Sequence, residues 1–404
     1  MMNHSGAQNR LPLEGLLVVD LTRMIPGPLC TMLLGDYGAE VIKIEDVEAG
    51  DPTRFVGPAV DGSGPFFRQL NRNKKSLALN LKSPEGKEVI RKLVKSADVL
   101  VEGFRPGVMA RLGLDYESLK AINNRLIYAS ISGYGQQGKY RERAGHDINY
   151  TAISGLLDLS TGKAGGPVMP AVQIADIAGG SLTAVNGIMF ALYDREKSGR
   201  GSYLDVAMTR GLLPWLTYAV SAINAHEEVP GRERGQITGA YACYNIYETA
   251  DGGYMSLGAL EPVFWQRFCE SVNRKEWVEL QFDNLCREKL IAEVKAIFKK
   301  KTRKEWEEHF ITIDACCEPV LQLDEAIKHQ VSREGKYWIK NRIRDGKEEL
   351  MTGFPILFNG TTGEIRLQPP RHGEHTDEIL KSLGYNADMI KEMAGKRLVH
   401  ITTR

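Results

Sequence analysis

The sequence predicts an α/β protein that has a parallel sheet in a large domain and a smaller α+β domain after it. Two observations indicate this fold class. In the first half of the chain, short apolar runs rich in β-branched residues alternate with segments of helical pattern, which is typical of parallel strands connected by helices. Farther along, residues 225–235 become charged and contain Pro and Gly, as segments between domains do.

Strands are expected where these apolar runs occur, because each is short and bounded by turn residues. They are residues 16–22 (LLVVDLT), 41–45 (VIKIE), 98–102 (DVLVE), a part of 125–135, and 202–208 (SYLDVAM). Between the first two, Pro26 opens a helix that ends near Gly35, because Pro suits the first helical turn. A second helix begins at Ser83, a good N-cap followed by Pro84.

Three further helices are expected. A helix rich in small residues covers 177–197, and an amphipathic, charged stretch covers 288–310 in the smaller domain, which spans roughly 230–330. The last helix follows Thr376, after the pair Pro369 and Pro370.

Composition excludes several classes of function. The 404 residues include 52 basic and 51 acidic ones, a net charge of +1, so no nucleic-acid partner is expected. The start of the chain is polar and no run approaches ~20 apolar residues, so neither a secretory signal nor a membrane partner is expected. The six cysteines form no C-x-x-C pair, which favours free thiols in a reducing compartment and no metal site. We therefore expect a cytoplasmic enzyme.

Motifs of several common enzyme classes are missing from the sequence. It has no G-x-G-x-x-G after the first strand, no G-x-x-x-x-G-K-[ST], no H-E-x-x-H and no G-x-S-x-G. Dinucleotide-binding, P-loop, zinc-protease and serine-hydrolase sites therefore lack their usual sequence signals.

Cationic residues follow the predicted strands, where parallel sheets bind their ligands. Such side chains can neutralise a phosphate-rich ligand, although scattered Lys and Arg also form ordinary solvated surfaces. The candidates are Arg23, Arg54, Arg72, Lys74, Lys75, Lys82, Arg105 and Arg111.

Three residues are candidates for proton transfer. His146 lies among polar residues in RAGHDINY, and histidine is the residue most often used for this chemistry. Asp176 lies between apolar residues just before the small-residue helix, so it is either a functional carboxylate or a simple N-cap. Glu261, before Pro262, has the same two interpretations.

Several segments together resemble one family. They are residues 13–45 (LEGLLVVDLTRMIPGPLCTMLLGDYGAEVIKIE), 50–54 (GDPTR), 71–86 (NRNKKSLALNLKSPEG), 97–114 (ADVLVEGFRPGVMARLGL), 198–208 (SGRGSYLDVAM), and 369–385 (PPRHGEHTDEILKSLGY). Their order is similar to that of the family III CoA-transferases, the CaiB/BaiF group, and of the α-methylacyl-CoA racemases.

The resemblance implies a fold and an assembly. Each chain has a Rossmann-like large domain at 1–225, a small domain at 226–335, and a segment at 336–404 that returns to the large domain. Two chains form an interlocked homodimer, with the active site between the large domain of one subunit and the small domain of the other.

The resemblance also implies how coenzyme A binds, as part of an acyl-CoA substrate and not as a permanent cofactor. Arg105 and Arg111 match residues that hold the nucleotide phosphates, and Leu79 and Lys82 match residues beside the adenine and its phosphate. The remaining matches are Met24 along the pantetheine channel, and Asp147 and Tyr150 near the thioester.

One position departs from the family pattern. The family usually has an Arg immediately after the second strand, stacked on the adenine, and this chain has Asp46 there. We expect Arg54 or Arg72 to supply the adenine contact instead.

The site residues favour the racemase branch over the transferase branch. The segments GHDINY, with His146, and GALEP, with Glu261, resemble the racemases. In that reaction His146 and Asp176 exchange the α-proton of a 2-methylacyl-CoA between its two faces, Glu261 orients His146, and amides at the start of the helix after Asp176 stabilise the enolate. The alternative is a CoA-transferase that forms a covalent intermediate on Asp176, and a protein that only binds acyl-CoA is a third possibility.

Overall fold

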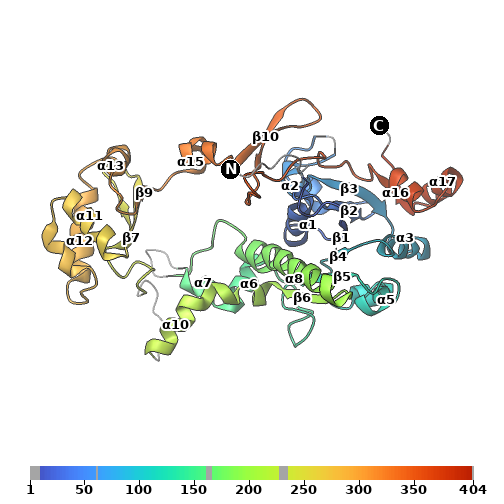
Figure 1. Ribbon diagram of the computed structural model, residues 1–404, viewed down its shortest axis with the longest axis horizontal. Helices are drawn as coiled ribbons and strands as arrows, with labels where there is room; N and C mark the ends of the chain where they lie inside the picture. The colour runs from blue at the N-terminus through green and yellow to red at the C-terminus, as the bar shows by residue number, and fades with distance from the viewer. Residues whose placement is uncertain (1–9, 61, 161–165, 227–234, 403–404) are drawn as a thin grey trace, which may run out of the picture. The chain divides into compact units, whose positions relative to one another are not determined.

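The computed structural model describes residues 10–60, 62–160, 166–226 and 235–402 (Figure 1). The chain forms two compact units. The first comprises Met1–Leu156, Met169–Pro214 and Gly335–Arg404, and the second comprises Leu157–Val168 and Trp215–Glu334. Most of the predicted linker, 225–235, lies outside the described residues.

A seven-stranded sheet organises the first unit, in the order β12-β3-β2-β1-β4-β5-β6. All neighbours pair in parallel except the short β12, which is antiparallel to β3. The order 3-2-1-4-5-6 is that of a Rossmann sheet, so the predicted parallel α/β architecture is confirmed. The strands are β1 Leu17–Leu21, β2 Glu40–Glu45, β3 Lys74–Leu79, β4 Val99–Glu102, β5 Ile127–Ser132, β6 Tyr203–Ala207 and β12 Val399–His400.

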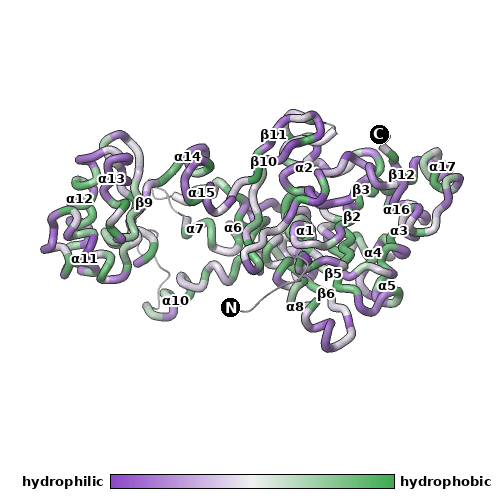
Figure 2. Tube along the Cα trace, turned by 45° about the horizontal axis from the view of Figure 1, so that its top comes forward, coloured by the Kyte–Doolittle hydropathy of each residue, from purple (hydrophilic) through white to green (hydrophobic). Residues whose placement is uncertain are grey.

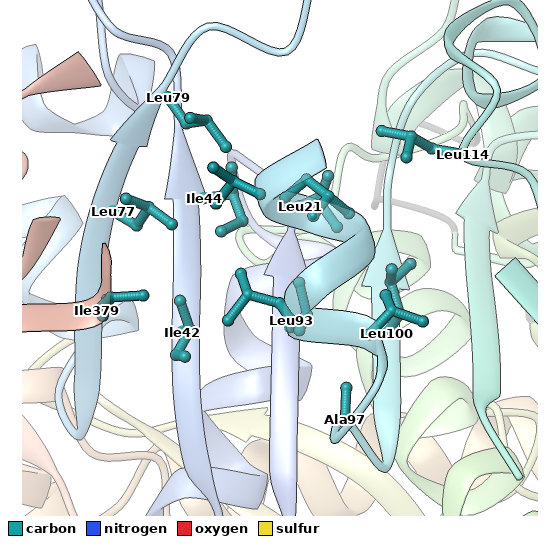
Figure 3. Close-up of a cluster of buried hydrophobic side chains, with 14 of the residues drawn as sticks. Leu21, Ile42, Ile44, Leu77, Leu79, Leu93, Ala97, Leu100, Leu114 and Ile379 are labelled. Carbon is teal, nitrogen blue, oxygen red and sulfur yellow. The ribbon is translucent and has the colours of Figure 1, made fainter. Parts of the chain in front are cut away.

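Helices cover both faces of this sheet because successive residues of each strand point to opposite sides. On one face, α3 (Pro84–Val94), α16 (Thr376–Ser382) and α17 (Ala387–Gly395) pack on a hydrophobic cluster. Figure 3 shows its members Ile42, Leu77, Leu79 and Leu93 pointing toward one another. On the other face lie α1 (Pro26–Asp36) and α8 (Thr183–Ser198), the latter along β5 and β6 (Figure 1).

Strand β3 was not predicted from the sequence, because it contains polar residues whose side chains are buried. Lys74 is fully buried, and its ammonium donates to Asp20 Oδ2 at 3.1 Å, to the Pro28 carbonyl at 2.8 Å and to Asn71 Oδ1 at 2.9 Å. The carboxylate that neutralises Lys74 lies 54 positions earlier in the chain, so the local apolar pattern of a buried strand is absent.

The predicted helix at 177–197 begins two residues earlier and with a different geometry. Ala175–Leu182 (η2) is a π-helix that continues into α8. Hydroxyl groups support the wider turn: Ser181 Oγ donates to the Asp176 carbonyl and Thr183 Oγ1 to the Ala178 carbonyl, both five residues back. Gly179 is required here, because a Cβ would overlap the Met208 carbonyl of α9.

The continuous helix Ala175–Ser198 is also long and apolar enough to cross a membrane by length and composition alone, the one such helix among the described residues. It packs on β5, β6 and α1, which accounts for much of its apolar character.

The C-terminal segment completes the first unit. The amide of Asn73 donates to the Leu367 carbonyl at 3.0 Å, and Val399 pairs with Leu79. The hydroxyl of Tyr37 donates to the Ile356 carbonyl at 2.9 Å. Other elements of this unit are η1 Pro52–Phe55, α2 Pro65–Leu70, α4 Val108–Leu112, α5 Tyr116–Lys120, α6 Asp147–Ser154, α9 Met208–Gly211, β10 Trp338–Arg342 and β11 Glu348–Thr352.

The second unit has an antiparallel three-stranded sheet covered by helices around its own core. The predicted helical stretch 288–310 is two helices, because Thr302 caps a new one: its hydroxyl accepts from the Glu305 amide. Hydrophilic and hydrophobic residues alternate along these helices (Figure 2), as amphipathic helices require. The elements are β7 Tyr244–Glu248, β8 Tyr254–Gly258, β9 Cys317–Pro319, α10 Thr217–His226, α11 Pro262–Ser271, η4 Lys275–Leu280, α12 Arg287–Phe298, α13 Arg303–Phe310, α14 Leu323–Lys328 and α15 Gln330–Glu334; η3 Leu213–Leu216 and α7 Leu156–Leu159 cross the borders of the two units.

Candidate active site

The loops that follow β1, β4 and β5 meet at the carboxyl edge of the sheet. A Cβ built on Gly103, after β4, would lie 3.9 Å from the Thr22 Cβ and 4.0 Å from the Ile131 carbonyl oxygen. The strand order reverses between β1 and β4, and open α/β sheets bind their ligands at such a point. Most of the predicted site residues of the first unit lie along this edge.

His146 is the N-cap residue of α6. Its amide donates to Asn149 Oδ1 at 3.0 Å, and its side chain is exposed. The loop before it is fixed by Tyr150, a buried residue whose hydroxyl donates to the Gly145 carbonyl at 2.5 Å. The Tyr150 ring fits because Gly133 has no side chain; a Cβ at that position would collide with it. The imidazole is thus presented to solvent from a fixed helix start.

Asp176 is the second residue of η2, and the N-cap of this helix is Ile174. The interpretation of Asp176 as a simple N-cap is therefore wrong. Its amide donates to Asp147 Oδ1 at 3.0 Å, which connects η2 to the first turn of α6. Because Asp147 follows His146 directly, this bond brings the two predicted proton-transfer residues to one place.

Burial and charge change the proton affinity of this cluster. Burial, and to a smaller extent the negative charge of Asp147, raise the pKa of Asp176 to about 6, although the nearby His146 acts to lower it. Burial together with the charge of Asp176 raises the pKa of Tyr150 to about 12, so the phenol keeps its proton at neutral pH. A carboxyl group that titrates near pH 6 can both accept and release a proton under physiological conditions.

The predicted cations fall into two groups. Arg23, Lys82, Arg105 and Arg111 are exposed and have no ion-pair partner within the described ranges. Arg105 also lies near enough to Tyr150 to lower its proton affinity. These residues are available to a phosphorylated ligand. The other four cations form ion pairs with carboxylates: Arg54, Arg72, Lys74 and Lys75. Lys75 bridges Glu40 and Glu378 at 2.9 and 2.8 Å.

Arg54 and Arg72 do not supply an adenine contact, contrary to the expectation from the sequence. Both are fully buried. Arg54 forms two hydrogen bonds with the Glu45 carboxylate, at 2.8 and 2.6 Å, and Arg72 pairs with Asp36 at 2.8 Å. Their partners end the second strand and the first helix, so these arginines stabilise the fold.

Leu79 and Met24, both predicted to contact coenzyme A, differ in exposure: the first is buried and the second is exposed. Leu79 is 1% exposed and its side chain packs in the core (Figure 3), so its contact with the nucleotide stays a prediction. Met24, in the loop after β1, is exposed and has a left-handed backbone with φ of 68°. Such a conformation is strained in a residue with a side chain, and strained residues concentrate at binding sites.

Glu261 is the N-cap residue of α11 in the second unit, and its side chain makes no capping hydrogen bond. The carboxylate is exposed. Its predicted effect on His146 stays a prediction.

Glu102 is a buried carboxyl group that sequence reasoning missed. It ends β4, accepts hydrogen bonds from the Ser130 hydroxyl and the Phe104 amide, and burial raises its pKa to about 7. It borders a cavity of about 250 Å³ that Arg105 and Tyr203 also line. The only signal in the sequence was a carboxylate at the end of an apolar strand. In the part of the chain that the structure describes, no group of three His, Cys, Asp or Glu residues is arranged to hold a metal.

Known proteins with different activities are similar to this chain. Human α-methylacyl-CoA racemase is 35% identical over 406 residues, which cover 96% of this chain and 98% of the human protein. Mouse succinyl-CoA:glutarate CoA-transferase is 33% identical over 400 residues, which cover 96% of this chain and 90% of the mouse protein. The crystal structure of a CaiB/BaiF family protein from Brucella suis superposes with a TM-score of 0.81 at 30% identity, over 93% of this chain and 100% of that one.

The sequence pattern of one family spans most of the chain, from residue 13 to residue 376. Together with the relatives above, this match shows that the chain belongs to the CoA-transferase family III, the superfamily of enzymes that also contains the α-methylacyl-CoA racemases.

Proposed function

We propose that this enzyme racemises 2-methylacyl-CoA thioesters by moving the α-proton between His146 and Asp176. The observation that carries the proposal is the hydrogen bond from the Asp176 amide to Asp147 Oδ1, at 3.0 Å. It places a partly buried carboxyl group, with its pKa raised to about 6, beside the helix start that presents His146.

The chemistry requires two groups on opposite sides of the α-carbon. In one direction, neutral His146 removes the α-proton and protonated Asp176 returns a proton to the other face. In the reverse direction, ionised Asp176 is the base and protonated His146 is the acid. Neither step needs a metal or a redox cofactor, and the net protonation of the pair is the same before and after turnover.

The thioester oxygen becomes negatively charged in the enolate and needs a hydrogen-bond donor. The first amide after Asp176, that of Ile177, already donates to the Gln173 carbonyl at 3.0 Å, and the amide of Asp176 itself donates to Asp147. The Asp147 amide is the first of α6, and amides at this position have no partner within their helix. We therefore assign the enolate contact to the Asp147 amide.

Binding of the CoA moiety follows from the exposed cations. Arg105 and Arg111 hold the diphosphate, Lys82 holds the ribose phosphate, and Met24 lies along the pantetheine arm. The proposal includes a homodimer in which Glu261 of the partner subunit orients His146, and a cytoplasmic location.

A CoA-transferase is the second candidate, because relatives with that activity match at an identity similar to that of the racemases. In that reaction the ionised Asp176 carboxylate attacks the thioester carbonyl, CoA leaves as the thiolate, and a mixed anhydride forms on Asp176. A free carboxylic acid must then act as the acceptor. A protein that binds acyl-CoA without turnover is the remaining alternative.

The deciding experiment is incubation of each pure epimer of a 2-methylacyl-CoA with the enzyme in D2O, followed by mass spectrometry and chiral chromatography. Incorporation of one deuterium with loss of optical purity supports the racemase. No incorporation, with an acyl or CoA adduct on Asp176 when a carboxylic acid is added, supports the transferase instead.

Variants sharpen this test. His146→Ala and Asp176→Ala should each lower racemisation by orders of magnitude, because one of the two proton-transfer groups is missing. Each should still exchange the α-proton of one epimer, with retention of configuration, and the two variants should act on opposite epimers. Near-normal racemisation by both variants would contradict the assignment. His329→Ala, in the second unit, is the control.

A further inference from the structure

Two histidines far apart in the sequence stack on each other in the first unit. The rings of His372, before α16, and His400, in β12, have their centroids 4.9 Å apart and their planes 13° from parallel. His400 is exposed and His372 is half-buried. The pair is therefore a flat aromatic surface that solvent reaches.

Backbone contacts place this surface at the carboxyl ends of β2 and β3. His400 pairs with Ala78, next to Leu79. His372 Nε2 lies 2.8 Å from the carbonyl oxygen of Asp46, the residue that follows β2. Neither ring takes part in the proton-transfer cluster at His146.

Hydrogen bonds hold the two rings in place. The Thr402 hydroxyl donates to the His372 carbonyl and lies 3.3 Å from His400 Nε2. Because this hydroxyl has a single proton, which it gives to His372, the nitrogen of His400 is the donor to Thr402 Oγ1. His372 Nε2 likewise donates to the Asp46 carbonyl. Partial desolvation of the His400 ring and the neighbouring His372 lower the pKa of His400, so this ring is neutral at pH 7 and stacks without charge repulsion.

The chemistry of an acyl-CoA determines which part fits such a surface. The adenine ring is the only aromatic group of coenzyme A, and purines stack on planar side chains with a gain of about tenfold or more in affinity. Arg54 and Arg72 are buried in ion pairs and leave this role unfilled. Asp46 carries no planar group that could stack.

The distance across the sheet from β3 to β5 matches the length of coenzyme A between its adenine and its thiol. Four strand spacings separate β3 from β5, in the order β3-β2-β1-β4-β5, which is about 19 Å. A diphosphate and an extended pantetheine arm bridge about this length, equal to roughly six residues of extended chain. The adenine would then lie at His372 and His400 while the thioester lies near His146, with Arg105, after β4, between them.

We propose that the stacked His372–His400 pair is the platform on which the adenine ring of coenzyme A binds. The proposal rests on the acyl-CoA substrate proposed above, and it is tested by binding alone, without turnover.

The test is isothermal titration calorimetry of the full-length protein with three ligands. Coenzyme A and 3′-phosphoadenosine 5′-phosphate carry the adenine, whereas 4′-phosphopantetheine lacks it. The variant His372→Ala/His400→Ala should bind the first two at least about tenfold more weakly and 4′-phosphopantetheine unchanged. His400→Phe, which keeps an aromatic ring, should retain the affinity for coenzyme A, and His329→Ala is the matched control.

The outcomes separate the two proposals. Unchanged affinity of the double variant for coenzyme A, or an equal loss for all three ligands, overturns the platform and leaves the acyl-CoA function untouched. A wild-type protein that binds no coenzyme A overturns the proposed function itself. Thermal unfolding of each variant checks that the fold is intact.

Discussion

Asp147, the residue after His146, accepts a hydrogen bond from the backbone amide of Asp176 at 3.0 Å, and its negative charge acts on the Asp176 carboxyl group. The carboxylate of Asp147 is held by the amide of Asp176, whereas the carboxyl group of Asp176 exchanges protons in the proposed reaction. This hydrogen bond connects the first turn of α6 to the π-helix, and it places a negative charge near Asp176 that raises the pKa of its carboxyl group.

Asp147→Asn should shift the pH dependence of racemisation toward acid. The charge of Asp147 raises the pKa of Asp176, so its removal lowers that pKa below about 6. The asparagine oxygen still accepts the amide of Asp176. Because each direction of racemisation uses the singly protonated pair, the pH profiles of kcat/KM for both epimers should shift together toward acid. A profile that stays in place would show that Asp147 has no electrostatic effect on the site.

Tyr150→Phe should weaken the enzyme without removing a catalytic group. The variant loses the hydrogen bond to the Gly145 carbonyl, which costs about 1 kcal/mol of stability and loosens the loop before His146. We expect a lower kcat at nearly unchanged CoA affinity, measured by chiral chromatography and calorimetry. Tyr140→Phe, on an exposed neighbour, is the control; equal effects of the two substitutions would contradict this role.

Arg105→Ala should weaken binding of coenzyme A, because an exposed guanidinium would be lost from the phosphate site. A charge-assisted hydrogen bond contributes about 1.5–3 kcal/mol, so the dissociation constant should rise at least about tenfold. The effect should shrink as the salt concentration increases. Arg141→Ala, which removes an exposed arginine paired with Glu142, should leave affinity unchanged. Titration calorimetry at two salt concentrations measures both.

Lys74→Met should destabilise the first unit strongly. It leaves the buried carboxylate of Asp20 without its ammonium partner at 3.1 Å, and breaking such a pair costs about 3–5 kcal/mol. Lys75→Met, one residue away, removes only partly exposed ion pairs and should cost less than about 1 kcal/mol. Urea unfolding of the two variants compares them directly, and similar midpoints would show that the buried pair contributes little.

Phe190→Glu should disrupt the proposed homodimer. Phe190 is 74% exposed on α8, and Met189, Tyr193 and Leu182 form an apolar face with it. A charge on this face would oppose burial against a second subunit. Light scattering coupled to size exclusion should show a dimer for the wild type and a smaller species for the variant. Glu196→Lys, elsewhere on the same helix, is the control, and a monomeric wild type would contradict the assembly.

The sequence predicted those parts of the fold that local patterns determine. β1, β2, β4 and β6 are apolar runs and were found within one residue of their ends, and β5 lies inside the predicted range 125–135. β3 was missed because Lys74 and Ser76 are neutralised and bound by Asp20 and Glu45, which no local pattern reveals.

In the candidate site, too, the features that depend on local sequence were predicted and those that depend on distant contacts were not. His146 and Asp176 could be selected because their neighbours in the sequence are unusual, and the structure joins them through Asp147. The roles of Arg54 and Arg72 could not be predicted, because burial and pairing with Glu45 and Asp36 depend on how distant segments pack. The π-helix depends on contacts with Met208 that are formed only in the folded chain.

The buried ion pairs of the first half also require the end of the chain. Arg54 donates to the Pro370 carbonyl at 3.1 Å and Arg72 to the Thr352 carbonyl at 2.7 Å, while β3 pairs with β12. During synthesis, the N-terminal half therefore leaves the ribosome with these donors unsatisfied and with one sheet edge open. The second unit is translated in between and can close on its own core first. The part of the enzyme that is made first therefore waits for residues 352–400, which are translated after the second unit, before its buried donors and its sheet edge are satisfied.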